Sequence, residues 1–224
     1  MAVAPIHIAA RTRDVETLRS LLAEGVSPDL VGGDSGRTPL LFLCVNPDPA
    51  GDRVACFKLL RDAGANLDAT SGSSGLTALH YRALNGDATM MSLLVEAGAT
   101  VDAVNAVGWT ALHFAALYFR RGNCVEVLLA AGASVNARTF TGDTPFRMAH
   151  MGSRRAWPMF LRAGAEIPTD ETQPYILRVR SAGGFQRYAQ EHLARITSIL
   201  APTPRLPPEM VRKIVEFWLH AGYY

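Results

Sequence analysis

Apolar residues along residues 1–167 recur in short helical stripes that are separated by glycine-containing turns. In GWTALHFAA, residues 108–116, leucine and alanine follow the threonine at the spacing of one helix face. Thr110 is placed to cap this helix, because its hydroxyl can accept from backbone N–H groups that have no partner within the helix. A second stripe over residues 125–129 ends at Gly132, a residue type that readily adopts the left-handed conformation that ends helices. The pattern predicts two short helices followed by a projecting hairpin, SVNARTFTGD.

This two-helix unit occurs in five copies. Aligned on the threonine position, the copies fall at Ala4, Thr38, Thr77, Thr110 and Thr144, so the intervals are 34, 39, 33 and 34 residues. A glycine–alanine marker before the hairpin, as in RDAGANLDA and LAAGASVNA, keeps the same period. The one long interval contains the proline-rich insertion NPDPAGD, residues 46–52. Units of this size are expected to stack, because none can bury its apolar face alone.

These motifs resemble the ankyrin repeat, with its threonine-proline-leucine-histidine turn and its glycine-alanine turn before a hairpin. The resemblance covers residues 1 to about 167 and implies an all-α ankyrin-repeat solenoid in which each unit is a helix-turn-helix followed by a β-hairpin. The expected units are about 1–33, 34–70, 71–104, 105–138 and 139–167. The fifth is degenerate, with Pro158 at the first turn of its second helix. In the first unit we expect Ile6 and Ile8 to be partly exposed.

Histidines recur at one position of the unit, as His7, His80 and His113. A catalytic group would not need copying, and in ankyrin repeats this histidine ties adjacent turns together by hydrogen bonds. Leu41 and Arg147 replace it in the second and fifth units, which fits structural variation better than ligand chemistry. The resemblance therefore implies a structural role, with no metal site and no catalytic residue.

The period is lost in residues 168–224, where a helical extension is expected. Pro174 should open a short helix that stops at Gly183–Gly184, a second apolar stripe covers residues 185–200, and a last helix runs from about Pro208 to His220. One interpretation is a cap that covers the fifth unit. The other is a docking helix for another protein, with Leu206, Pro207, Val211, Ile214, Val215 and Trp218 as its contact residues.

Two partial resemblances favour docking. LPPEMVRKIVEF, residues 206–217, resembles the opening of an F-box, in which a helix binds a ubiquitin-ligase adaptor. EHLARITSIL followed by RLPP partially resembles a suppressor-of-cytokine-signalling box. These resemblances imply a rival function, in which the protein is the substrate receptor of a ubiquitin ligase, the repeats select the target and the last helix recruits the ligase.

The composition and the motifs of the chain argue against several classes of function. The chain has 224 residues, 49% of them hydrophobic, and a formal charge of +2, too small to indicate a nucleic-acid partner. We identify no signal peptide and no membrane-spanning run, and three unpaired cysteines fit a reducing compartment, so a cytoplasmic or nuclear location is expected. Glycine-rich phosphate loops and zinc-spaced cysteine pairs are absent, so we expect no enzyme activity and no cofactor.

We therefore interpret the protein as a monomeric, non-enzymatic scaffold that binds another protein through its concave surface. In ankyrin geometry, the residues just after LHFAA in the fourth unit face the concave groove, and aromatic residues next to arginine are typical of interface hot spots. The predicted contact residues are Tyr81, Arg82, Trp109, Leu117, Tyr118, Phe119, Arg120 and Phe140.

Overall fold

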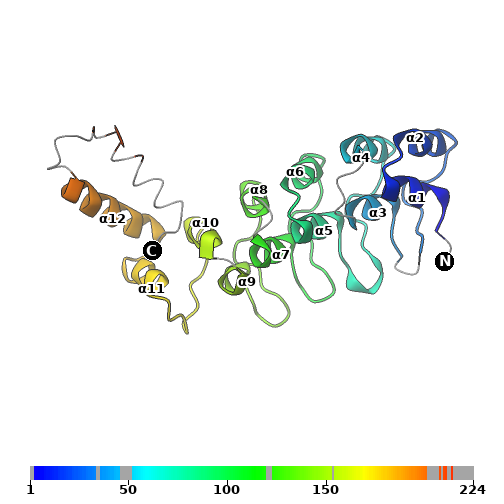
Figure 1. The fold of residues 1–224 in the computed structure, drawn as a ribbon. Coiled ribbons are helices and arrows are strands. Elements are labelled where there is room, and N and C mark those ends of the chain that lie inside the picture. Colours follow the sequence, from blue (N-terminus) through cyan, green and yellow to red (C-terminus); the bar gives the residue numbers. More distant parts are fainter. Residues whose placement is uncertain are drawn as a thin grey trace.

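A computed structural model describes residues 3–33, 36–45, 52–119, 123–152 and 154–200, together with residues 207, 209, 210 and 213. Ten helices stack in two rows (Figure 1). The inner row holds the first helix of each unit: α1 (Pro5–Thr12), α3 (Pro39–Val45), α5 (Ala78–Asn85), α7 (Ala111–Leu117) and α9 (Pro145–Gly152). The outer row holds the second: α2 (Val15–Ala23), α4 (Arg53–Asp62), α6 (Ala88–Glu96), α8 (Cys124–Ala130) and α10 (Trp157–Arg162).

The five two-helix units agree with the predicted solenoid, and Thr110 stands at the N-cap of α7 as predicted. The hairpins project on the side of the inner row (Figure 1) and are barely strand-like. The described residues hold only isolated antiparallel bridges, Gly32–Arg37 and Ser71–Leu76, and a 3-10 turn, η1 (Gly72–Ser74), interrupts the second of these hairpins. Each projection is therefore a turn with at most one bridge.

One continuous apolar core runs through the stack. The residue two positions after the threonine is buried in every unit, and the buried set is Ile6, Leu40, Leu79, Leu112 and Phe146. The expectation that Ile6 would be partly exposed is wrong, because this position faces the neighbouring helices rather than the open end. Ile8, on the other face of α1, is 43% exposed, as expected.

A ladder of side-chain oxygens joins successive units beside the outer helices. Asp68 accepts from the backbone N–H of Thr100 at 2.8 Å, and Asp102 accepts from that of Ser134 at 3.0 Å. The complete set of ladder acceptors is Asp29, Asp68, Asp102 and Asn136, each paired with the following unit. The fifth unit carries Pro168 at this position, where no side chain can accept.

The helices after the repeats continue both rows. In Figure 1, α11 (Pro174–Ser181) follows the inner row and α12 (Phe185–Leu200) the outer row, with the 3-10 turn η3 (Arg154–Ala156) before α10. Ile176 and Phe185 are buried in the same core as the repeats, and α12 packs on α10. Of this segment, α11 and α12 therefore pack on the end of the repeats, as the first interpretation predicts. Among the described residues, no helix has both the length and the apolar character needed to cross a membrane.

Candidate protein-binding surface

In each recurring histidine, both ring nitrogens contact backbone groups. In the third unit, Nδ1 of His80 accepts from the N–H of Thr77 at 3.1 Å, and Nε2 lies 2.9 Å from the carbonyl oxygen of Trp109 in the next unit. A backbone N–H can only donate and a carbonyl can only accept, so the ring is neutral with its hydrogen on Nε2. His113 repeats this arrangement, and burial lowers the pKa of both rings.

His7 makes the same tie, with Nδ1 bonded to the N–H of Ala4 and Nε2 at 2.6 Å from the carbonyl oxygen of Leu30. The structural role implied by the resemblance is therefore confirmed: each ring closes the start of its helix and holds the next hairpin. Metal coordination would require a ring nitrogen that these contacts already use.

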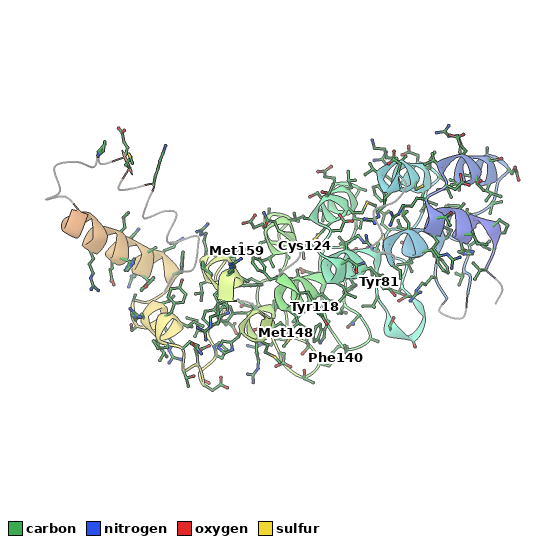
Figure 2. The ribbon with its side chains drawn as sticks, viewed as in Figure 1. Tyr81, Tyr118, Cys124, Phe140, Met148 and Met159 are labelled. Carbon is green, nitrogen blue, oxygen red and sulfur yellow. The ribbon has the colours of Figure 1, made fainter. Side chains whose placement is uncertain are left out.

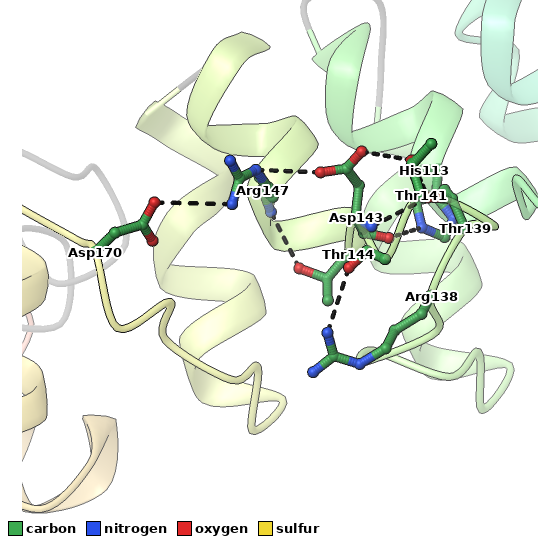
Figure 3. Close-up of polar contacts among 9 residues, drawn as sticks. His113, Arg138, Thr139, Thr141, Asp143, Thr144, Arg147 and Asp170 are labelled. Atoms are coloured by element: carbon green, nitrogen blue, oxygen red, sulfur yellow. Dashed lines mark hydrogen bonds and ion pairs between the residues drawn. The ribbon is translucent and has the colours of Figure 1, made fainter.

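Arg147 replaces the histidine in the fifth unit and reaches beyond the repeats. Its guanidinium pairs with Asp143 at 3.1 Å and lies 3.9 Å from a carboxylate oxygen of Asp170 (Figure 3). Asp170 belongs to the connection that leads into α11. The longer side chain thus reaches from the last unit to the connection that leads into α11. No repeat hairpin follows this unit, so an imidazole here would lack the carbonyl that it binds in the other units.

Leu41 leaves the second and third units without the histidine tie, and other contacts join them. Arg53 at the start of α4 forms an ion pair with Asp87, the N-cap of α6. The guanidinium of Arg37 donates to the hydroxyl of Tyr81 at 3.4 Å and lies over its ring. These contacts cross the interface between the second and third units.

Two residues predicted for the binding surface are buried. Arg82 is 0% exposed and pairs with Asp87 at 3.2 Å, and Tyr81 is 6% exposed, with its hydroxyl donating to Ser71. The expectation that they would extend the exposed surface is wrong. The position of Arg82 faces the interior in every unit, where the others carry Ala9, Leu43, Ala115 and Ala149. Neither residue is therefore part of the candidate surface.

The other predicted residues differ in exposure. Tyr118 is 45% exposed and Phe140 is 77% exposed. Trp109, Leu117 and Phe119 are half-buried and pack against the core. Arg120 lies outside the described residues. In Figure 2, Phe140 lies at the hairpin edge, Tyr118 lies at the level of the inner row and Cys124 lies in the outer row.

Aromatic rings connect the hairpin edge to the end of α7. The ring of Phe140 covers Gly108, where an added Cβ would stand 2.8 Å from a ring carbon. The next residue, Trp109, packs on Phe114 with 4.9 Å between ring centroids, and Phe114 lies one helical turn before Tyr118. We call the four side chains of this path, together with Val107 next to Gly108, the unit-four strip. Its residues are Val107, Trp109, Phe114, Tyr118 and Phe140.

Sequence reasoning missed part of this surface. Val104 and Val107 are 53% and 55% exposed at the hairpin, and Met151 of α9 is 73% exposed. Gly152 lies directly on the carbonyl oxygen of Leu117, which brings the ends of α7 and α9 together. For Phe114 of the strip the available signal was its position after the recurring histidine, where all five units carry a large apolar residue: Ile8, Phe42, Tyr81, Phe114 and Met148. Val104, Val107 and Met151 do not occupy this position.

The predicted docking helix cannot be placed on the structure. Leu206, Val211, Ile214, Val215 and Trp218 lie outside the described residues, and Pro207 is exposed. The docking interpretation therefore stays a hypothesis from the sequence.

Comparison with known proteins decides the family. Residues 41–139 match the family model described as ankyrin repeats (3 copies). The chain is an ankyrin-repeat protein. It is 34% identical over 179 residues to SH3 and multiple ankyrin repeat domains protein 2 of Homo sapiens, covering 78% of this chain and 9% of that protein. It is 31% identical over 173 residues to the B-cell lymphoma 3 protein homolog of Mus musculus, covering 72% and 36%.

A relative from Arabidopsis thaliana, named "Putative E3 ubiquitin-protein ligase XBAT31", is 31% identical over 152 residues, covering 62% of this chain and 32% of that protein. The ankyrin-repeat chain thus spans between 9% and 36% of the length of these three relatives.

Proposed function

We propose that this ankyrin-repeat protein is a non-enzymatic scaffold that binds another protein through the unit-four strip. Ankyrin repeats generally mediate protein–protein interaction. The observation that carries the proposal is the exposed apolar end of the strip, where Phe140 and Val107 remain 77% and 55% exposed. Large exposed aromatics beside a packed ring are typical of residues that carry binding energy.

The energetics fit a moderate interface. Burying a Phe side chain against a partner contributes roughly 1.5–3 kcal/mol, and Tyr118 has about half of its surface left to bury. Trp109 and Phe114 are already ordered against each other, so the strip loses little side-chain freedom when a partner binds. Truncation of two exposed rings should therefore weaken binding by tenfold or more, that is by about 1.4 kcal/mol or more.

The test is affinity capture with a double variant, Tyr118→Ala with Phe140→Ala, compared with the unchanged chain. The matched control is Ile8→Ala with Val31→Ala, which likewise removes one exposed apolar residue from the inner row and one from a hairpin, at 43% and 46% exposure. We expect the first variant to lose its captured proteins and the control to keep them, with melting curves unchanged. Full capture by the first variant, with the fold intact, would reject the strip as the binding surface.

The proposal has three further parts. We propose a monomer, a boundary between repeats and cap at about residue 167, and a cytoplasmic or nuclear location. The absence of a ladder acceptor at Pro168 supports the boundary. Cys44, Cys56 and Cys124 are free thiols, which fits a reducing compartment. Burial raises the pKa of all three thiols, which disfavours the nucleophilic thiolate and supports a non-enzymatic role.

The second candidate function is the substrate receptor of a ubiquitin ligase, favoured by the similarity to the Arabidopsis relative, which is named as a putative E3 ubiquitin-protein ligase. It rests on residues 206–217, which resemble an F-box opening. Capture by the full chain and by a chain that ends at Thr203 separates the two functions. Loss of ligase components alone on truncation would support the receptor, whereas an unchanged set of captured proteins would exclude it.

A further inference from the structure

Two hollows in the cap share one arginine. The first lies between η3, α10 and the start of α11 and is lined by Arg154, Trp157 and Arg178; the second lies between α11 and α12 and is lined by Arg178, His192 and Arg195. Their cavity volumes are about 230 and 350 Å³. Because Arg178 lines both, the hollows adjoin, and we call them together the Arg178 groove.

The lining of this groove is cationic. Arg154, Arg178 and Arg195 are exposed, and Glu191 is the one acidic residue among the described residues that line it. Arg178 donates from Nε to the carbonyl oxygen of Pro174 at 3.3 Å, and within the described part of the chain neither Arg154 nor Arg178 has a carboxylate partner. Burial and the positive charges of Arg195 and Arg178 lower the pKa of His192, which supports a positive field at this site.

Aromatic rings form the floor beneath these charges. The guanidinium of Arg154 lies over the ring of Trp157 at 5.7 Å, and His192 stacks on Tyr188 with 5.6 Å between centroids. Trp157 and Tyr188 are 4% and 6% exposed, so they are fixed in the core and hold the polar groups above them. An anionic side chain entering the groove would meet guanidinium groups that are already positioned.

We propose that the Arg178 groove binds an acidic segment of a partner protein, in which aspartate or glutamate side chains pair with Arg154, Arg178 and Arg195. A nucleic acid fits less well, because Glu191 interrupts the arginines and the groove is too short to follow many phosphates. The chain's own residues 201–224 carry Arg205, Arg212 and Lys213 against Glu209 and Glu216, so their charge does not complement the groove. This second site is independent of the unit-four strip.

The test uses the full chain and a fluorescent peptide of about ten residues, which spans roughly 33 Å when extended. Glutamate alternates with alanine in this peptide, and glutamine replaces glutamate in the neutral comparison peptide. At low ionic strength we expect the glutamate peptide to bind and the glutamine peptide not to bind. Arg178→Glu should weaken binding by about tenfold or more, and Arg195→Glu should also weaken it.

The control is Arg187→Glu, which makes the same charge reversal at an exposed arginine of α12 that lines neither hollow. Its affinity for the glutamate peptide should stay within about threefold of that of the unchanged chain, because a distant charge is screened. Melting curves of the three variants report the fold. Three results would overturn the proposal: no binding of the glutamate peptide, equal weakening by Arg178→Glu and Arg187→Glu, or tighter binding of a single-stranded RNA of matched charge.

Discussion

The Nε2 atom of His113 lies 3.1 Å from the carbonyl oxygen of Asp143, a residue of the following unit. The same ring receives the N–H of Thr110 on Nδ1, and its side chain is buried. One imidazole therefore closes the first turn of α7 and fixes the hairpin that precedes α9. The stability of the fourth and fifth units should depend on it.

Replacing His113 with alanine should lower the free energy of unfolding by about 1–3 kcal/mol, because the Thr110 N–H and the Asp143 carbonyl lose their partner in a buried site. Urea unfolding monitored by circular dichroism measures this loss. The same preparations should contain no stoichiometric zinc. Zinc that is present in the unchanged protein and lost in the variant would contradict the structural role of the histidine.

Stability should also fall in mild acid. Burial lowers the pKa of His80 and His113 below the ordinary value of about 6.5. The unfolded chain therefore binds more protons than the folded one below that pH, so the stabilisation is complete above about pH 6.5 and is lost as the pH falls towards the folded pKa values. Unfolding free energies measured between about pH 8 and 5 should show this slope. A double variant, His80→Gln with His113→Gln, should flatten it, and an unchanged slope would reject the explanation.

The Arg82–Asp87 pair should respond asymmetrically to substitution. In Arg82 the Nε and Nη2 atoms have no hydrogen-bond partner among the described residues, and the second unit carries Leu43 at the same position. Arg82→Leu should therefore change stability by less than about 1 kcal/mol, or increase it. Asp87→Asn keeps a side-chain oxygen that can cap α6 but leaves a buried guanidinium without its counter-ion, at a cost of about 3–5 kcal/mol.

Thermal melting of the two variants measures the asymmetry. A large loss in Arg82→Leu with little effect of Asp87→Asn would show that the arginine contributes packing rather than an unfavourable buried charge.

The cap helices should stabilise the repeats. A chain that ends at Ala165 removes α12 from its contact with α10 and should melt at a lower temperature or become less soluble. A milder test is Ile176→Ala on α11, where loss of a fully buried side chain should cost about 2–5 kcal/mol. If the shortened chain keeps the melting temperature of the full chain and stays monomeric, α11 and α12 are not a cap. This result would support the docking interpretation.

The repeated part of the fold was predictable because the period places the same residue type in the same environment five times. The apolar stripe over residues 185–200 likewise predicted α12. The exposure of equivalent residues in different units was less predictable. Ile8 and Tyr81 occupy equivalent positions, yet the first is exposed and the second is covered by Arg37, which lies 44 residues earlier in the chain.

The exposed surface was only partly predictable for the same reason. Arg82 looks like a surface residue in the sequence, but its ion-pair partner Asp87 also pairs with Arg53 of the preceding unit, so the cluster exists only after the units stack. The apolar hairpin residues Val104 and Val107 carry no helical stripe that would mark them. Tyr118 was identified because it follows LHFAA, where ankyrin geometry places the concave groove, and Phe140 because it lies on a neighbouring hairpin.

The ladder along the outer helices also limits how the array can grow. Asp29, Asp68, Asp102 and Asn136 each reach forward, so a duplicated internal unit would bring both its own acceptor and the backbone N–H that the previous unit needs. The backbone N–H of a unit joined after the fifth would have no side-chain acceptor, because Pro168 occupies the acceptor position. Gene duplication or engineering should therefore add units in the middle of the array, and the fifth unit should remain the last of the repeats.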